Sequence, residues 1–340
     1  MKSTRFKAYS NILKNNFSNL LRIRTYPRFA HFFITWRCNL RCRECNNWQK
    51  DETSELDTAS LLRIIDQLNF LDVIKITGGE PFIRDDIVGI ITEIRSKINP
   101  YIIQITTNGT YTERIIETVK QVHFPGLSLR ISLDGMNDIH DKIRGVDGCY
   151  EKVQETILAL IDLKKKRSFH LGINYGLRDE TMPFLEEIFG ICIKHNIGLI
   201  MGYPIKPFLE NADFSSRRNV MAIEDNVLKK YKRFMYLQKP RRKPVESFVS
   251  NFLNKTFLKH ESADRIQFDC GELRDLMYIL PNGDLVTCGL RQQKISNLLE
   301  ETFKDIWFSK GMEKHCRQIQ NCSGCMQKSI KLGSKIYKFL

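Results

Sequence analysis

Long apolar runs are missing from this 340-residue chain. None reaches the roughly 18 residues that a membrane-spanning helix needs. The basic N-terminal segment 1–17 also lacks the apolar core and the small-residue cleavage site of a secretory signal. These absences argue against a membrane-spanning or secreted protein.

A disulfide framework is not indicated either, although the chain contains ten cysteines. The chain is long, shows no export signal, and groups its cysteines at short spacings. Such spacings are typical of metal ligation in a reducing compartment, so we expect a cytoplasmic protein.

Acidic residues are few relative to basic ones, and the formal net charge is +14. Segments 1–30 and 328–340 combine basic and apolar residues and contain no acidic residue. Two interpretations stay open: ordinary solvated helices, or an anionic partner such as a phosphate-bearing substrate or the inner membrane face, bound peripherally. Nucleic acid is a weaker option, because no RNA-binding motif accompanies the basic residues.

Apolar periodicity predicts strands that alternate with helices. The expected strands are 31–35, 72–77, 101–107, 127–135, 169–176 and 198–203. The expected helices are 85–98, 111–121, 149–166 and 181–195, preceded by a helix that Asp57 caps. This alternation indicates an α/β fold with a parallel sheet.

Periodicity alone does not separate a doubly wound sheet from an incomplete barrel. The loops favour the barrel, because four successive predicted strands end in small, polar or ligand-type residues. In barrels the chemistry gathers at the carboxyl ends of the strands. We therefore expect a partial (β/α)6 TIM-like barrel with one site at that end.

Three cysteines follow the first predicted strand in "WRCNLRCRECNNW", with the spacing C-x3-C-x2-C: Cys38, Cys42 and Cys45. Structural zinc and electron-transfer iron–sulfur cubes take four protein ligands. No fourth cysteine follows until Cys149, and the nearest histidines in sequence are His31 and His123. A cube held by three thiolates keeps one iron open for a substrate or cofactor.

This cysteine motif, together with "GGEP" after the second predicted strand, resembles the radical S-adenosylmethionine (radical SAM) superfamily over about residues 30–204. The resemblance implies a [4Fe–4S] cluster whose open iron is chelated by SAM. It also implies reductive cleavage of SAM to a 5′-deoxyadenosyl radical, which abstracts hydrogen from a substrate.

The resemblance further assigns SAM contacts. Gly78 and Gly79 would let the backbone approach the methionyl amine, and Glu80 would balance its charge. Ser132 and Asp134 would bind the ribose, Arg144 the carboxylate, and Asn108 and Asn174 are weaker candidates. Ordinary turn and surface roles are the alternatives for Glu80, Asp134, Arg144, Asn108 and Asn174.

A second set of cysteines lies near the C-terminus: Cys270, Cys288, Cys322 and Cys325. Two short strands joined by "PNG" form a predicted hairpin between the first two of them. The pattern resembles a twitch or truncated SPASM extension, which implies one auxiliary [4Fe–4S] cluster; zinc is the alternative. Cys316 is either a plain thiol or a replacement for Cys322, whereas Cys149 and Cys192 are expected to be buried structural thiols.

The predicted organisation has four parts: a basic extension at 1–30, the radical SAM core at 31–204, a linker or helical insertion at 205–265, and a small α+β cysteine-rich domain with a basic tail at 266–340. The expected activity is a redox modification of a sugar, lipid-linked or other small substrate, served by a reductant such as flavodoxin or ferredoxin. Alternatives are a peptide-modifying enzyme, a non-catalytic metal scaffold, and a metal-stapled nucleic-acid-binding protein.

Overall fold

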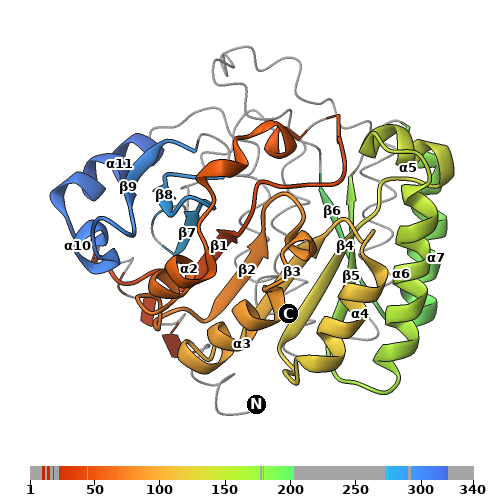
Figure 1. Cartoon of the computed structure of the whole chain (residues 1–340), viewed down its shortest axis with the longest axis horizontal. Coiled ribbons are helices and arrows are strands. Elements are labelled where there is room, and N and C mark those ends of the chain that lie inside the picture. The colour runs from red at the N-terminus through yellow and green to blue at the C-terminus, as the bar shows by residue number, and fades with distance from the viewer. Residues whose placement is uncertain are drawn as a thin grey trace, which may run out of the picture. The chain divides into compact units, whose positions relative to one another are not determined.

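Within the residues that the structure describes, nine strands form one sheet in the computed structural model (Figure 1). The structure describes residues 10–11, 14–15, 18, 23–202 apart from 44, 177 and 179, and 273–320 apart from 274, 290 and 291. The order of the strands is β6-β5-β4-β3-β2-β1-β7-β8-β9. Their bounds are β1 Phe29–Phe33, β2 Val73–Thr77, β3 Ile102–Thr107, β4 Leu127–Ser132, β5 His170–Gly176, β6 Gly198–Gly202, β7 Leu276–Ile279, β8 Asp284–Val286 and β9 Lys294–Asn297.

The chain divides into two compact units, Met1–Glu210 with Glu272–Cys316, and Asn211–Gly271 with Arg317–Leu340. All of the strands described above belong to the first unit. Most of the second unit, and with it the predicted insertion at 205–265, lies outside the described residues.

Strand order decides between the two architectures that the sequence left open. Strands β1 to β6 are parallel and are neighbours in chain order, whereas a doubly wound sheet reverses its order. Right-handed crossovers then place all connecting helices on one face of the sheet. These helices are α2 Thr58–Ile65, α3 Ile87–Lys97, α4 Thr112–Gln121, α5 Asn137–Arg144, α6 Cys149–Lys164 and α7 Leu185–His195. The predicted partial barrel is confirmed.

The two faces of the sheet differ in character. On β2 and β3, Ile74, Ile76, Ile103 and Ile105 face the helices and are at most 1% exposed. On β4, Ile131 faces the same way, because its side chain and that of Val153 on α6 both lie beside Gly109. The alternating residues, such as Lys75 on β2, point to the opposite face and are only half-buried. That opposite face is called the inner face below.

The C-terminal strands extend the barrel sheet. β7 pairs in parallel with β1, Phe29 facing Leu276, and β8 returns antiparallel to β7. The hairpin predicted at "PNG" is therefore confirmed, but its strands continue the barrel sheet. Strand β9 and the helices α10 Phe303–Trp307 and α11 Lys310–Gln320 were not predicted. Trp307 of α10 is fully buried and stacks on Phe303.

Two boundaries near the site differ from the prediction. Strand β1 covers Phe29–Phe33 rather than 31–35, because the backbone at Thr35–Arg37 bonds to the Glu55 side chain and to the turn after β2. The short helix α5 was not predicted, since most of its residues are polar. Within the described residues, no helix is both long and apolar enough to span a membrane.

Candidate functional site

The three clustered cysteines lie on the loop that follows β1, at the carboxyl end of the strands. Each is partly accessible to solvent. Within the loop, the Cys45 amide donates to the Cys42 carbonyl oxygen at 3.1 Å, and the Leu40 amide lies 3.5 Å from the Cys38 sulfur. All three thiols therefore lie at one strand end, as the sequence predicted.

This cysteine loop is anchored to the C-terminus of α5. The amides of Arg41 and Arg43 donate to the carbonyl oxygens of Arg144 and Ile143, at 3.0 and 3.1 Å. These are helix-end carbonyls, which have no partner inside a helix. Gly145 ends α5 in the left-handed region at φ +70°, and a side chain there would overlap the Arg41 carbonyl. The loop and the helix therefore stabilise each other.

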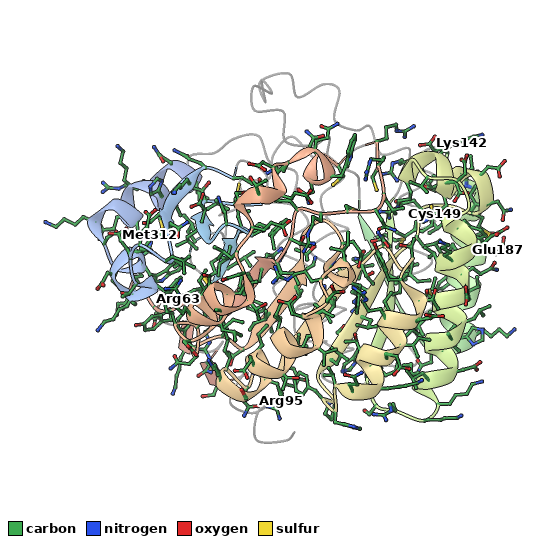
Figure 2. The ribbon with its side chains drawn as sticks, in the orientation of Figure 1. Arg63, Arg95, Lys142, Cys149, Glu187 and Met312 are labelled. Atoms are coloured by element: carbon green, nitrogen blue, oxygen red, sulfur yellow. The ribbon has the colours of Figure 1, made fainter. Side chains whose placement is uncertain are left out.

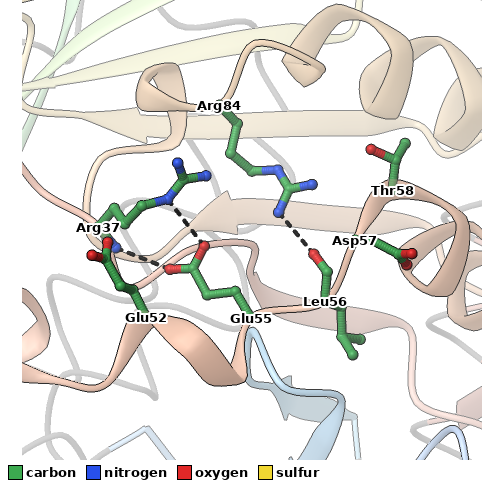
Figure 3. A pocket seen from close by; sticks show the side chains of 7 residues that line it. All are labelled: Arg37, Glu52, Glu55, Leu56, Asp57, Thr58 and Arg84. Atoms are coloured by element: carbon green, nitrogen blue, oxygen red, sulfur yellow. Dashed lines mark hydrogen bonds and ion pairs between the residues drawn. The ribbon is translucent and has the colours of Figure 1, made fainter.

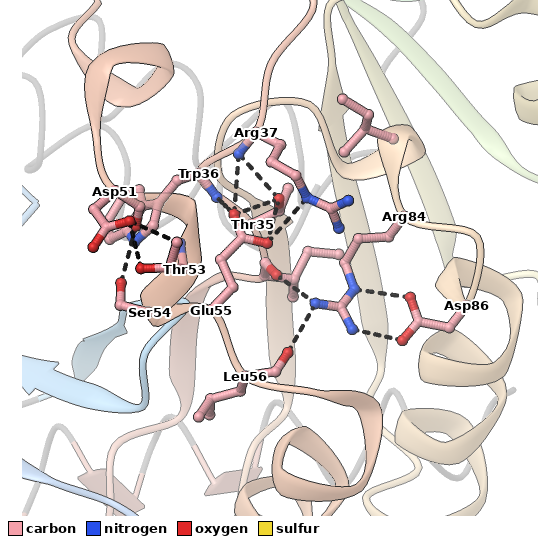
Figure 4. A network of polar contacts seen from close by, with 12 residues as sticks. Thr35, Trp36, Arg37, Asp51, Thr53, Ser54, Glu55, Leu56, Arg84 and Asp86 are labelled. Carbon is pink, nitrogen blue, oxygen red and sulfur yellow. Dashed lines mark hydrogen bonds and ion pairs between the residues drawn. The ribbon is translucent and has the colours of Figure 1, made fainter.

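A second support comes from Glu55, which sequence reasoning missed. Its carboxylate accepts hydrogen bonds from the Thr35 hydroxyl at 2.8 Å and from the amides of Trp36 and Arg37 (Figure 4). It is paired with the Arg37 guanidinium at 3.2 Å (Figure 3). Glu55 thus fixes the backbone that leads into Cys38. Nothing in its local sequence predicts this role, because the partners are distant in the chain.

Arg84 is a further support that the sequence did not reveal. Its guanidinium donates to the carbonyl oxygens of Ile34 and Leu56 at 3.1 and 3.2 Å, and pairs with Asp86 at 2.6 Å (Figures 3 and 4). Asp86 also accepts from the Thr58 hydroxyl. Arg84 therefore joins the end of β1 to the start of α2 below the cysteine loop. Arg84, Glu52 and Asp57 are among the residues that line a surface hollow (Figure 3).

The glycine pair after β2 lies against the same loop. A side chain at Gly78 would overlap the carbonyl oxygen of Thr35, and one at Gly79 those of Trp36 and Arg37. The Gly79 amide donates to the Thr35 carbonyl at 2.8 Å. Glycine is therefore required here for backbone packing, in addition to any role in the predicted approach of SAM.

Glu80 is fully buried and holds two strand ends together. Its carboxylate accepts from the Phe82 amide at 3.1 Å, the Thr107 hydroxyl at 2.7 Å and the Asn108 amide at 2.7 Å. Burial raises the pKa of Glu80 to about 7, although these donors act in the opposite direction. Through these hydrogen bonds Glu80 links the ends of β2 and β3.

The predicted SAM contacts Asp134 and Arg144 form an ion pair at 2.8 Å. Asp134 also accepts from the Gly176 amide at 2.7 Å. Although burial opposes it, the charges of Arg144 and Arg178 keep the pKa of Asp134 low. Arg144 also places one guanidinium nitrogen 3.7 Å from the Cys42 sulfur. The two residues thus form a charged bridge from β4 to the cysteine loop, and their contacts with SAM stay predictions.

The other predicted contacts lie at the same strand ends. Asn108 donates to the Asn39 side chain at 2.8 Å and accepts from the Thr110 amide at 2.9 Å, close to Cys38. Ser132 and Asn174 are paired neighbours on β4 and β5. The structure therefore brings all eight predicted SAM-contact positions to the carboxyl ends of β2 to β5 or beside the cysteine loop.

The remaining cysteines divide into three groups. Cys149, which is labelled in Figure 2, and Cys192 are buried, as predicted. The Cys149 thiol donates to Asp141 at 3.2 Å. Cys288 follows β8, and Cys316 on α11 accepts from Arg24. Cys270, Cys322 and Cys325 lie outside the described residues. The geometry of the second cysteine set is therefore not described beyond Cys288.

Two family models match the chain. Residues 32–189 match the model described as the radical SAM superfamily, and residues 270–326 match an iron–sulfur cluster-binding domain. The chain contains a radical SAM domain. These two domain matches support the SAM and iron–sulfur cofactors that the sequence motifs predict.

Several curated proteins are similar in sequence to part of this chain. A "Pre-heme d1 synthase" from Dinoroseobacter shibae is 27% identical, covering 47% of this chain and 39% of the relative. A "Probable GTP 3′,8-cyclase" from Thermococcus kodakarensis is 33% identical, covering 42% of this chain and 48% of the relative. The chain thus spans less than half the length of these relatives.

Solved structures share the fold. The structure described as "Native anSMEcpe with bound AdoMet" has a TM-score of 0.60 at 14% identity, covering 92% of this chain and 96% of that one. Streptococcus suis SuiB bound to S-adenosylmethionine has a TM-score of 0.59 at 17% identity, covering 92% and 71%. At these identities the likeness establishes the fold alone.

Proposed function

We propose that this chain is a radical SAM enzyme in which Cys38, Cys42 and Cys45 hold a [4Fe–4S] cluster with one open iron. The observation that carries the proposal is the placement of three thiols on one partly accessible loop at the carboxyl end of β1. Among the described residues, no three ligand-type side chains converge on a single metal ion. A cube accepts each thiolate at a separate corner, so its ligands need not converge.

The surrounding residues fit this group. Burial raises the pKa of the Cys38 thiol to about 12, so the free thiol is protonated near neutral pH and must lose a proton to ligate iron. Arg144 beside Cys42 supplies a positive charge that offsets thiolate charge. When bound, the cluster would supply the electron that cleaves SAM. The chain's own contribution is a loop fixed by α5, Glu55 and Arg84.

Anaerobic reconstitution tests this proposal. With dithionite, the wild-type chain should convert SAM to 5′-deoxyadenosine and methionine, measured by liquid chromatography. The triple variant Cys38→Ala, Cys42→Ala, Cys45→Ala should abolish the reaction and remove about half of the iron, one of two cubes. Cys192→Ala, which removes a buried thiol of α7, is the matched control and should keep both. SAM cleavage by the triple variant would refute the cluster assignment.

The net reaction belongs to the same proposal. We infer a redox modification in which the C-terminal cysteines Cys270, Cys288, Cys322 and Cys325 hold an auxiliary cluster that takes an electron from the substrate radical. A fully ligated cluster has no open iron, which favours electron transfer over substrate binding. A cytoplasmic flavodoxin or ferredoxin would supply the first electron. Peripheral membrane binding by the basic ends is a separate hypothesis.

Peptide modification is the second candidate. The favouring observation is the shared fold with S. suis SuiB, one of whose structures is described as bound to a precursor peptide, with a TM-score of 0.59. The curated relatives instead carry names of small-molecule reactions, namely GTP cyclisation and heme synthesis. Incubation with candidate peptides and small molecules, read out as substrate-stimulated 5′-deoxyadenosine formation, separates the two.

A further inference from the structure

The middle rows of the inner face of the sheet carry polar and basic side chains. The register aligns His31 with Lys75, Lys75 with Gln104, and Gln104 with Ser128. The next row contains Thr106 and Arg130. Among the inner-face positions of the described strands β1 to β7, none is occupied by Asp or Glu. These described strand positions therefore contribute basic side chains to the inner face and no acidic ones.

Arg130 occupies a slot made by two glycines. On the neighbouring strands, Gly172 pairs with Arg130, and Gly198 pairs with Gly172. A side chain at Gly172 would overlap one guanidinium nitrogen of Arg130, and a Cβ at Gly198 would lie 2.7 Å from it. The missing side chains on β5 and β6 thus let the guanidinium lie flat across the inner face.

The Arg130 guanidinium has no partner among the described residues. Its Nε is buried without a hydrogen bond, and neither a hydrogen bond nor an ion pair involves its other nitrogens in the described part of the chain. Burial lowers the pKa of this guanidinium, yet arginine stays charged in proteins. A buried charge without a partner is destabilising, so such a group is kept where a ligand supplies the partner.

The described neighbours of Arg130 do not neutralise its charge. The nearby His170 has a pKa lowered by burial and by Arg130 itself, so this imidazole is neutral at neutral pH. Cys192 reaches the region from the helix side, where burial raises its thiol pKa to about 12 and keeps it uncharged. Within the part of the chain that the structure describes, this positive charge is therefore left for an anion to match.

We propose that Arg130 binds an anionic oxygen group, a phosphate or a carboxylate, of the substrate. A guanidinium offers parallel N–H donors that match both groups. The inference rests on the proposed function, because it takes the inner face below the cysteine loop as the substrate site. It adds the charge class of the substrate and the residue that recognises it.

Anion titration of the reconstituted full-length chain tests this. Pyrophosphate represents the phosphate source and malonate the carboxylate source, each titrated by calorimetry at constant ionic strength. We expect saturable binding of at least one anion to the wild type. Arg130→Gln should weaken it by about tenfold or more, and Arg130→Lys by less, because lysine keeps the charge without the planar donor pair.

Two further variants keep the test decisive. Gly172→Ala keeps the charge but pushes the guanidinium from its slot, so it should also weaken binding if Arg130→Gln proves insoluble. Arg63→Gln is the matched control, since it removes the same charge from the helix layer (Figure 2) and should leave affinity unchanged. The anion with the tighter binding identifies the substrate group.

Equal affinity in the wild type, Arg130→Gln and Gly172→Ala would overturn the inference. So would equal losses in Arg130→Gln and Arg63→Gln, or the absence of saturable binding of both anions to the wild type. SAM cleavage is measured separately on the wild type. Anion binding without SAM cleavage would refute the proposed function alone, and SAM cleavage without anion binding would refute this inference alone.

Discussion

Glu80 has a structural role beside the one that the motif predicts. The resemblance places it near the SAM amine, which stays a prediction, and its carboxylate accepts hydrogen bonds from Phe82, Thr107 and Asn108 inside the protein. One oxygen accepts two donors and the other accepts one. A neutral amide cannot satisfy both sides, because its nitrogen would face the Asn108 amide as a second donor.

Replacing Glu80 with Gln should lower the free energy of unfolding by about 1–3 kcal/mol, the cost of an unsatisfied buried donor. Urea unfolding under anaerobic conditions measures this. Glu187→Gln, an exposed position of α7 (Figure 2), is the control and should change stability by less than about 0.5 kcal/mol. An equally small loss of unfolding free energy in Glu80→Gln would contradict the proposal that Glu80 links β2 and β3.

The same carboxyl gives a pH prediction. Burial raises the folded pKa of Glu80 to about 7, above the roughly 4.3 of an unfolded chain. The folded state then binds the proton more tightly, so this contribution to stability is lost as pH rises from about 4 through about 7. The stability difference between wild type and Glu80→Gln should therefore shrink over this range. A stability difference that grows with pH would show that the hydrogen bonds lower the folded pKa of Glu80 by more than burial raises it.

At this scale the sequence predicted residue types better than residue contacts. Local spacing was enough to place Cys38, Cys42 and Cys45 on one loop. It did not reveal Glu55 or Arg130, because their environments are made by residues far away in the chain, Thr35–Arg37 for the first and Gly172 and Gly198 for the second. Such contacts follow from strand register, which periodicity does not specify.

At the scale of elements, the cysteine loop depends on α5. The loop amides bond to the last carbonyls of this helix, and Gly145 permits the close approach. Sequence analysis missed α5 because the helix is short and mostly polar, with His140 and Ile143 as its only buried residues. Tertiary contacts with the loop, rather than an apolar stripe, define its end.

Gly145→Ala should therefore disturb the cluster site. Both Gly145 and Gly148 have left-handed backbones, at φ +70° and +74°, but a Cβ at Gly148 meets nothing within 4 Å. Each alanine variant should lose about 1–2 kcal/mol to backbone strain. Only Gly145→Ala should lose more than this and also bind less iron. Urea unfolding and iron analysis measure the two effects; equal iron content would show that the loop does not need α5.

Strand assignment shows the same limit. The helix capped by Asp57 was predicted correctly, since the Asp57 side chain accepts from the Ser60 amide at 2.8 Å. The short strand β9 and the helices α10 and α11 were missed, because few apolar residues mark β9 and α11. Their stability comes from packing, as the burial of Trp307 shows.

At the scale of the whole molecule, the two cysteine sets are predicted to act in sequence. The strand–helix units of the barrel carry the first set, and Cys288 with three residues outside the described part would carry the second. Cys322→Ala with Cys325→Ala should thus remove about four irons per chain. The variant should still form 5′-deoxyadenosine without substrate, but it should fail to form product.

Metal analysis and product assays check this prediction. Cys316→Ala is the matched control and should keep about eight irons if Cys316 is a plain thiol. Zinc in the wild type, with about four irons, would replace the auxiliary cluster by a structural zinc site. Full product formation by a soluble double variant would remove the electron-transfer role.

Strand β1 lies between β2 and β7, and this position affects how the chain folds during synthesis. Its partner on one side begins at Val73, but its partner on the other side begins at Leu276. Until the ribosome has made that last segment, one edge of β1 remains unpaired. Exposed strand edges pair with other chains. Expression with weak induction should therefore reduce aggregation, because fewer nascent chains with an open β1 edge would be present at the same time.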